Sequence, residues 1–352
     1  KELFACFEAY RKIEIRGIMV FALEMPPRLV YVKIQADHAM AVLPDRASLQ
    51  MMEYIARTAP SKGVWNDLPL YLDAVTRSMN DREMLDKDDY ALIKSCGLRC
   101  RGRGQWPSLR RYRVGFMPWY LDDEDRDLLG TAMRAVCRIA KHGSLGPEDL
   151  QKDGKILAVN PADGSVRWEK VGDLSPKEMD YPVCDVENEL ELQRLKRRPR
   201  LSGDWDVAVQ AFPFPSSGEE GGAPRYPMML ILIDENSDTV LDLAITEQWE
   251  GEPYLNFARI LLAKIAEHGR PAHLLCANTR TLALLTAWSR SLDNGLDADE
   301  AFDTVRSAFN TQVQRREEAV STASNALEFA FDFMERIYNF GETGQEMVVF
   351  VN

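Results

Sequence analysis

The side chains best suited to chemistry in this sequence are six arginines in one short stretch. Between residues 98 and 121 the chain reads LRCRGRGQWPSLRRYRVGFMPWYL, and no acid occurs from residue 90 to residue 121. Guanidinium groups bind phosphate and carboxylate oxygens in pairs, and aromatic rings stack on nucleic-acid bases. The stretch therefore predicts an anion-binding site. Its predicted contact residues are Arg99, Arg101, Arg103, Arg110, Arg111, Arg113, Trp106 and Trp119.

The same stretch has a second interpretation, in which its arginines belong to the packing of the domain. Acidic runs lie close by in the sequence, DKDD at residues 86–89 and DDEDRD at residues 122–127. Arginine–carboxylate pairs also serve ordinary packing, and tryptophan buries a large area when it anchors an irregular loop. We favour this interpretation, an anchored and charge-compensated loop. Any arginine that the fold leaves unpaired would then mark the anion contact.

Cysteine and histidine do not form a predicted metal site. The sequence has six cysteines and four histidines, and only Cys96 and Cys100 lie close together. Structural zinc needs four ligands, and no second ligand pair is present. So few thiols indicate reduced cysteines, as in a cytoplasmic protein. We therefore expect neither a metal nor a cofactor.

The apolar pattern of the N-terminal half predicts a small β-sheet with helices. Alternating and continuous apolar runs indicate strands, helical spacing indicates helices, and Asp163-Gly164 has the freedom that a tight hairpin turn needs. The expected elements are a helix over 3–12, strands over 17–24, 28–35 and 39–45, a helix over 49–58 capped by Ser48, a second amphipathic helix over 68–81, a helix after Asp122 or Asp123, and a hairpin over 154–171.

The middle of the chain predicts a boundary between two domains. Residues 194–200 read RLKRRPR and residues 212–224 read FPFPSSGEEGGAP, a composition that buries little apolar surface. The predicted organisation is an N-terminal domain over 1–188, a linker or long loop over 189–225, and a C-terminal domain over 226–352. The C-terminal pattern alternates strands and helices, so the fold class is α+β with a mixed sheet.

Two family resemblances extend this picture. The string from Gly102 to Leu121 resembles a segment of bacterial two-domain proteins of unknown function, whose N-terminal domain carries a similar Gly-Arg-Gly, Trp-Pro and Pro-Trp pattern. Residues Met228 to Leu292 resemble the ribonuclease-H-like core of retroviral-type integrases, in which a strand ends in an aspartate and a hairpin, a helix and a short strand follow. The first resemblance implies no activity. The second implies a ribonuclease-H-like mixed sheet with helices and, in active members, carboxylates that hold two divalent ions.

Asp234 is the one candidate catalytic residue that the second resemblance implies. It ends the run PMMLILID, where active members place their first carboxylate. Where those enzymes place a second acid, the sequence reads Ala277-Asn278. Glu328, Asp332 and Glu335 could approach Asp234, but their spacing is equally that of a solvated helical face. We favour a turn-forming aspartate over a catalytic one.

Charge and hydropathy limit the classes of partner that the protein can have. Its 352 residues carry a net charge of −12, and this field repels phosphate polymers and anionic membranes. No apolar run reaches the length of a bilayer, and the first residues lack a secretion signal, so we expect a cytoplasmic protein. The expected partner is a protein or a small anionic ligand, and nucleic acid is disfavoured. Apolar residues recur near heptad spacing over 298–338, with packing on their own domain as the default and a homodimer interface as the alternative.

The favoured function is therefore a non-enzymatic binding or scaffolding protein of unknown partner. The first alternative is a metal-dependent nuclease or phosphoryl-transfer enzyme that uses Asp234. The second is a nucleic-acid-binding or anion-binding module centred on Arg99 to Arg113.

Overall fold

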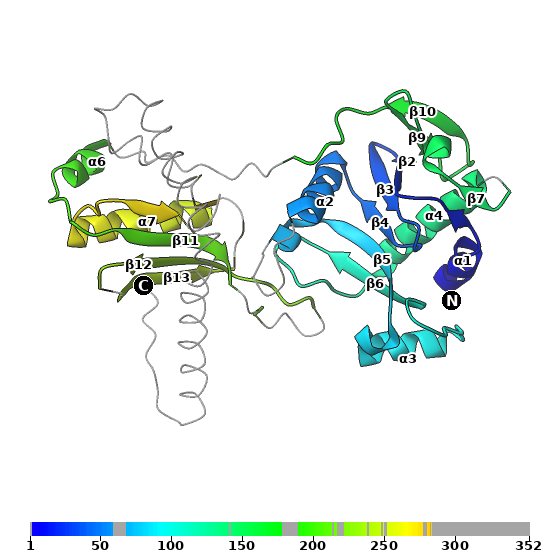
Figure 1. The fold of residues 1–352 in the computed structure, drawn as a ribbon, viewed down its shortest axis with the longest axis horizontal. Helices are drawn as coiled ribbons and strands as arrows, with labels where there is room; N and C mark the ends of the chain where they lie inside the picture. Colours follow the sequence, from blue (N-terminus) through cyan, green and yellow to red (C-terminus); the bar gives the residue numbers. More distant parts are fainter. Residues whose placement is uncertain are drawn as a thin grey trace.

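The chain folds into two mixed sheets with helices, which lie side by side (Figure 1). The computed structural model describes residues 2–58, 68–140, 142–177, 189–212, 215–216, 222–237, 239–247, 249, 252–276, 280–281 and 283. Within these residues, no helix is long and apolar enough to span a bilayer.

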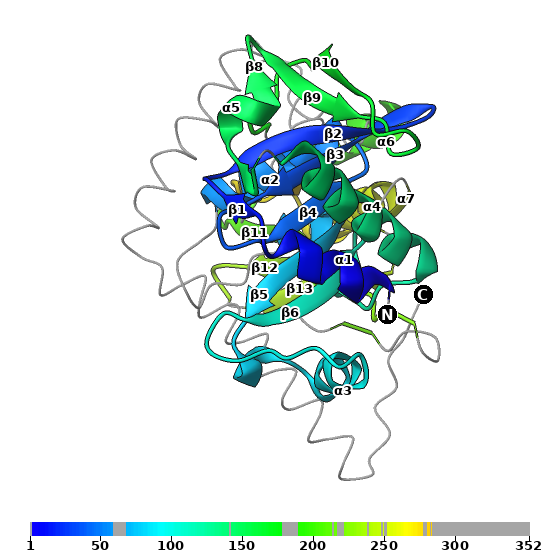
Figure 2. The ribbon, with the colours of Figure 1, turned by 90° about the vertical axis from the view of Figure 1, so that its right-hand side faces the viewer.

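The N-terminal sheet is built around a meander of antiparallel strands, and a parallel pair, β2 with β9, makes it mixed (Figure 2). A short strand, β8 (Gln151–Lys152), pairs with β9 outside the main path. The order across the sheet is β10 (Val166–Lys170), β9 (Lys155–Val159), β2 (Met19–Met25), β3 (Arg28–Ile34), β4 (Met40–Leu43), β5 (Ala74–Asn80) and β6 (Trp106–Tyr112).

Helices cover both faces of this sheet, which explains why its strands read as continuous apolar runs. In β2, Phe21 and Leu23 pack in the core under α1 (Glu2–Tyr10) and α4 (Asp123–Ile139). The alternate residue, Ala22, packs in the core on the opposite side, under α2 (Arg46–Thr58). The remaining short elements are β1 (Glu14–Ile15), which pairs in parallel with β7 (Ser144–Leu145), η1 (Leu68–Tyr71), η2 (Arg82–Met84), α3 (Lys87–Ser95) and α5 (Pro147–Leu150).

The C-terminal sheet has four strands in the order β13 (Thr239–Thr246), β12 (Met228–Asp234), β11 (Trp205–Ala211) and β14 (Leu274–Cys276). Strands β11, β12 and β13 are antiparallel, and β14 runs parallel to β11. Helix α7 (Glu252–His268) lies along one face of the sheet, and α6 (Glu189–Lys196) contacts α7 (Figure 1). Alternate residues of β11, from Trp205 to Ala211, are buried in the core beneath α7.

Three local expectations are corrected by this fold. The predicted helix over 68–81 is instead the short helix η1 followed by strand β5, which fills the gap between β4 and β6. The expected linker over 189–225 contains α6 and β11, a central strand of the C-terminal sheet. The expected irregular loop contains strand β6, which pairs with β5 along seven residues from Trp106 to Tyr112. In each case pairing with distant strands decided the conformation, and local composition does not encode that pairing.

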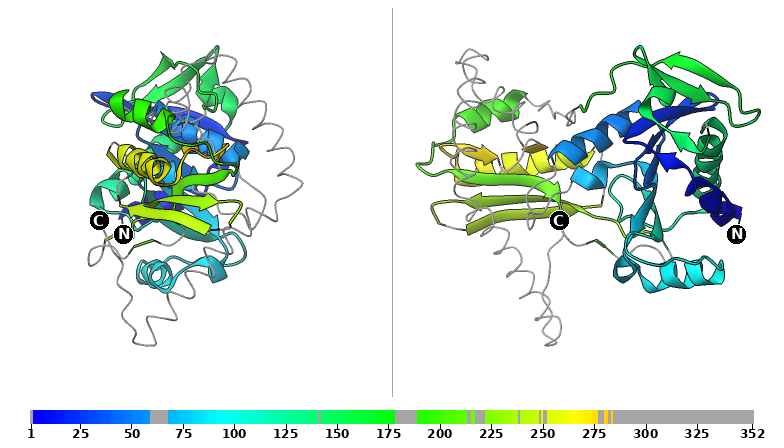
Figure 3. Two further views of the ribbon diagram at one scale, coloured as in Figure 1. Left: turned by 90° about the vertical axis from the view of Figure 1, so that its left-hand side faces the viewer. Right: turned by 45° about the vertical axis from the view of Figure 1, so that its right-hand side comes forward.

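Backbone hydrogen bonds connect the N-terminal part of the chain to the C-terminal part at one junction. Gly115 N donates to Leu70 O and Tyr226 N donates to Gly115 O, each at 2.8 Å, and Met117 N donates to Pro224 O at 2.8 Å. Figure 1 and the right-hand view of Figure 3 show α2 on the side of the N-terminal sheet that faces the C-terminal part. The segment that follows β6 thus pairs directly with the segment that precedes β12.

Trp249 lies at the centre of this junction. Its Nε1 donates to Tyr226 O at 2.6 Å, and its ring meets the Tyr71 ring edge to face, with centroids 5.0 Å apart. The Arg280 guanidinium lies over the Tyr71 ring, 4.9 Å from its centroid. A Cβ added to Gly115 would lie 2.8 Å from the indole nitrogen, so only glycine allows this approach.

Candidate anion-binding site

A long connection joins β5 to β6 and carries three of the predicted arginines, Arg99, Arg101 and Arg103. We call this segment, residues 81–105, the β5–β6 connection. The last backbone pair of the hairpin is Asn80 with Trp106, so the connection leaves and re-enters the sheet at one point. It contains η2 and α3, and Figure 2 shows α3 set off beyond β6, away from α1, α2 and α4. The connection is therefore a structured insertion in the β5–β6 hairpin and not a tight turn.

Arg99, Arg101 and Arg103 are exposed on this connection, and within the described residues none has a hydrogen-bond or ion-pair partner. Cys100, between the first two, is buried, and burial raises the pKa of its thiol. The buried thiol anchors the middle of the segment while the arginines on both sides point outward. At its end, Gly104 N donates to Asp81 Oδ1 at 2.7 Å, which closes the connection onto its own beginning.

Arg110 lies on β6 and is held by two aspartates of α3. Its guanidinium donates to Asp89 Oδ1 and Oδ2 at 2.9 and 2.6 Å, and to Asp86 Oδ2 at 2.8 Å. The hydrogen bond to Asp89 raises the pKa of Arg110. Tyr120 donates its hydroxyl to Asp86 at 2.9 Å, and burial together with this bond raises the pKa of Tyr120 to about 12. This cluster fastens α3 to the sheet.

Arg111 and Arg113 are also paired with aspartates. Arg111 Nη1 donates to Asp73 Oδ1 at 2.5 Å, and its Nε lies 3.4 Å from Asp125 Oδ1. Burial raises the pKa of Asp125, although Arg111 opposes this. Arg113 donates to Asp122 at 3.2 Å, and a backbone hydrogen bond from Asp125 lowers the pKa of Asp122, the N-cap of α4. The six predicted arginines therefore divide into three that pair with aspartates and three that have no such partner among the residues that the structure describes.

The two predicted tryptophans pack against neighbouring side chains. Trp106 meets Tyr90 with ring centroids 5.9 Å apart, and the Arg82 guanidinium lies 4.9 Å from the Tyr90 centroid and 6.0 Å from that of Trp106. Trp119 contacts Tyr120 at 5.3 Å and forms a backbone bridge with Arg111. These rings stiffen the site, and Arg82 is a basic member of it that the sequence pattern did not single out.

The charge of Asp86 contributes to the stability of its cluster with Arg110 and Tyr120. Burial opposes its ionisation, but hydrogen bonds from Asp89 N and Tyr120 and the charge of Arg110 outweigh this and lower the pKa of Asp86. Asp86 therefore contributes stability that is present above its unfolded-state pKa and lost as the pH falls through its folded-state pKa.

We expect Asp86→Asn to lower the free energy of unfolding by about 1 kcal/mol at pH 7, because the amide keeps the helix cap and loses the charge. The deficit should narrow as the pH falls below about 4, where aspartate titrates. Urea unfolding at pH 7 and at a pH below about 4 measures the difference in the free energy of unfolding between the variant and the unmodified protein. Asp88→Asn is the matched control, since within the described residues the Asp88 carboxylate forms no ion pair and accepts a single long hydrogen bond, from Tyr120 at 3.5 Å. Equal losses for both variants would show that the Asp86 charge contributes nothing.

Asp234 lies at the end of β12, as expected, and its carboxylate accepts a hydrogen bond from Asn236 N at 3.0 Å. This contact belongs to the turn before β13. Nearby, His273 Nδ1 lies 2.8 Å from Asp204 Oδ1, at the ends of the neighbouring strands. Within the described residues no three histidine, cysteine or acidic side chains gather as a metal site. Glu328, Asp332 and Glu335 lie outside the described residues, as does the region of heptad-like apolar spacing over 298–338.

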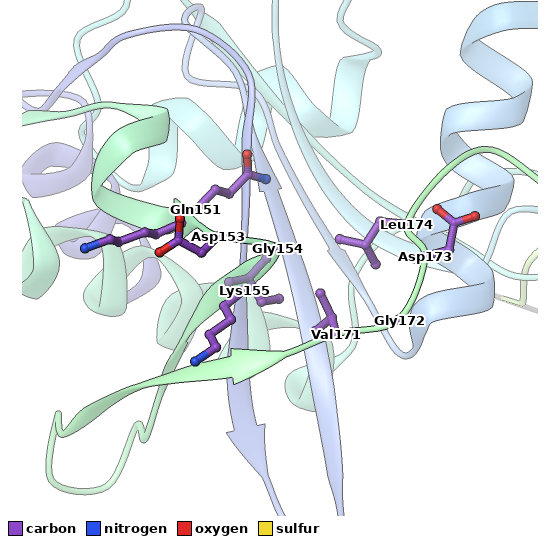
Figure 4. A pocket seen from close by; sticks show the side chains of 10 residues that line it. Gln151, Asp153, Gly154, Lys155, Val171, Gly172, Asp173 and Leu174 are labelled. Carbon is purple, nitrogen blue, oxygen red and sulfur yellow. The ribbon is translucent and has the colours of Figure 1, made fainter.

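An open pocket lies beside the β8–β9 hairpin, near the edge of the N-terminal sheet opposite β6 (Figure 4). Figure 4 shows Asp153 and Lys155 on one wall and Asp173 on the other. Hydrogen bonds from Ser175 lower the pKa of Asp173, so this carboxylate stays ionised and is poorly suited to proton transfer. The lining residues are Gln151, Lys152, Asp153, Gly154, Lys155, Ile156, Val171, Gly172, Asp173 and Leu174.

Arg77 is a buried charged residue that the sequence pattern did not single out. Its guanidinium is 1% exposed, lies 4.4 Å from the Phe7 ring centroid and 5.1 Å from that of Tyr10, and donates to His38 O. Burial lowers the pKa of Arg77 to about 10. Local periodicity predicts a helix over this segment, but its pairing with β4 makes it strand β5 and turns Arg77 toward α1.

Two regions of the chain match models of protein families. Residues 31–158 match the family described as Domain of unknown function (DUF7309), and residues 191–311 match the one described as Domain of unknown function (DUF6930). No curated protein and no solved structure matched the chain. The expected pairing of two domains of unknown function is confirmed. The matches show no link to ribonuclease-H-like proteins, and the arginine string lies inside the first matched region.

Proposed function

We propose that this protein functions by binding an anionic partner through the β5–β6 connection, with Arg99, Arg101 and Arg103 as the contact residues. The observation that supports the proposal is the division of the arginines. Three are neutralised by aspartates and hold the scaffold, while the three on the connection are exposed and without partners among the described residues.

The charges around the connection strengthen this inference. It carries six basic and five acidic residues, and Arg110 neutralises two of those acids, Asp86 and Asp89. The part from residue 90 to 105 has four basic residues and no acid. Screening at physiological salt limits charge effects to about 8 Å, so this local surface attracts an anion despite the net charge of the whole protein.

Polyphosphate is a suitable first probe, because it presents anionic groups without bases or side chains. We expect the triple variant Arg99→Ser, Arg101→Ser, Arg103→Ser to bind it about tenfold more weakly, since three exposed ion pairs contribute about 0.5 kcal/mol each. The affinity of the unmodified protein should fall as salt rises, with a shallower dependence for the variant. Titration calorimetry at two salt concentrations measures both.

The matched control removes three exposed lysines from the opposite edge of the sheet, Lys152→Ser, Lys155→Ser and Lys170→Ser. It changes the net charge equally and should leave binding unchanged. Equal weakening in the two triple variants would show a general charge effect and would overturn the proposed site.

A further inference from the structure

The β5–β6 connection exposes apolar side chains as well as arginines. Met84 on η2 is 73% exposed and Leu92 on α3 is 47% exposed. A single exposed apolar residue is ordinary on a protein surface. Here two of them share a connection with four guanidinium groups, those of Arg82, Arg99, Arg101 and Arg103.

Backbone hydrogen bonds bring the apolar and basic residues together in two places. Gly104 N donates to Asp81 Oδ1 at 2.7 Å, so Arg103 and Arg82 belong to segments that are bonded to each other, and Met84 N donates to Asp81 O at 3.1 Å. At the other end of α3, Leu98 N donates to Ile93 O at 3.3 Å. This bond places the segment of Arg99 beside that of Leu92.

The aromatic rings of the site point to the class of partner. Binding of single-stranded nucleic acid uses ring faces on which bases stack. Tyr90 and Trp106 already contact each other, and Arg82 lies over both. Methionine adapts to irregular apolar partners, and arginine beside apolar residues is typical of the core of protein interfaces. The surface therefore matches a partner that carries carboxylates and apolar side chains together.

We propose that the β5–β6 connection binds an acidic segment of a partner protein in which apolar residues alternate with glutamate and aspartate. The carboxylates of the segment pair with Arg82, Arg99, Arg101 and Arg103, and its apolar side chains cover Met84 and Leu92. This inference rests on the proposed function and names the partner class for the same site.

Three labelled probes test the inference on the full chain by fluorescence anisotropy. They are a peptide of alternating glutamate and leucine pairs, an oligoglutamate of equal charge, and a single-stranded oligonucleotide of equal charge. We expect the glutamate–leucine peptide to bind about tenfold more tightly than either of the others. The double variant Met84→Ser, Leu92→Ser should remove this preference and leave oligoglutamate binding unchanged.

The control variant Ile18→Ser, Val166→Ser removes two other exposed apolar side chains and should retain the preference. Equal binding of the peptide and oligoglutamate would overturn the apolar contribution while the arginine site stood. Tightest binding of the oligonucleotide would overturn the protein partner in favour of nucleic acid. If the triple arginine variant binds every probe as the unmodified protein does, the proposed function itself fails.

Discussion

Replacing Arg110 with methionine is expected to lower the free energy of unfolding by about 3 kcal/mol at pH 7. The substitution leaves the Asp89 carboxylate, 7% exposed, without the guanidinium that donates to both of its oxygens. Removing one partner of a buried ion pair costs about 3–5 kcal/mol, because the remaining charge stays desolvated. Asp86, which also accepts the hydrogen bond from Tyr120, loses its hydrogen bond from Arg110. Helix α3 therefore loses its attachment to the sheet. Chemical denaturation measures the loss.

Arg113→Met is the matched control for this prediction. Arg113 and Asp122 form a similar pair with both side chains 52% exposed, and such pairs contribute less than about 1 kcal/mol. Adding Asp89→Asn to Arg110→Met should recover much of the stability, since it removes the unpaired charge. A loss of the same size for Arg110→Met and Arg113→Met would contradict the role of burial.

Gly115→Ala is expected to lower the free energy of unfolding by about 3–4 kcal/mol. Gly115 has φ +79°, a conformation that costs an L-residue about 1–2 kcal/mol. The new Cβ would also lie within 2.9 Å of three atoms of the Trp249 indole, so the ring must leave its hydrogen bond to Tyr226 O. Displacing a packed aromatic ring costs a further increment of a similar size. Denaturation in urea measures the total.

Gly97→Ala separates the two contributions. Gly97 has φ +73° and no atom within 4 Å of an added Cβ, so its substitution carries the backbone cost alone. We expect about 1–2 kcal/mol for this control. In a Trp249→Ala background, the cost of Gly115→Ala should fall to the same value. An unchanged cost in that background would mean that Trp249 does not depend on Gly115, and the packing of the junction would need another explanation.

The arginine–aromatic string thus serves three purposes along its length. Arg99, Arg101 and Arg103 form the proposed contact, Arg110 and Arg111 fasten β6 to α3 and to the start of α4, and residues 114–117 form the junction with the C-terminal part. Strand β6 lies between the proposed contact residues and the junction segment.

The sequence by itself determined the elements whose signals are local. The helix over Asp123–Ile139 begins at the predicted cap, the hairpin of β9 and β10 turns at Asp163-Gly164, and β12 lies where the apolar run PMMLILID predicted a strand. Capping, turn geometry and apolar periodicity act between residues close in the chain, so they can be read without a structure. The pairing of two domains of unknown function was implied by the family resemblance of the string from Gly102 to Leu121.

Only the tertiary structure decided which arginines are free. Arg103 and Arg110 lie in the same acid-free stretch, yet Arg103 is exposed and Arg110 lies against Asp86 and Asp89. Their difference depends on α3 folding back onto β6, and on β5 forming a strand where local periodicity favoured a helix. Strand pairing and ion pairing join residues far apart in the chain, and the energy of such contacts is absent from any local pattern. For that reason the candidate site became visible only when the fold brought these segments together.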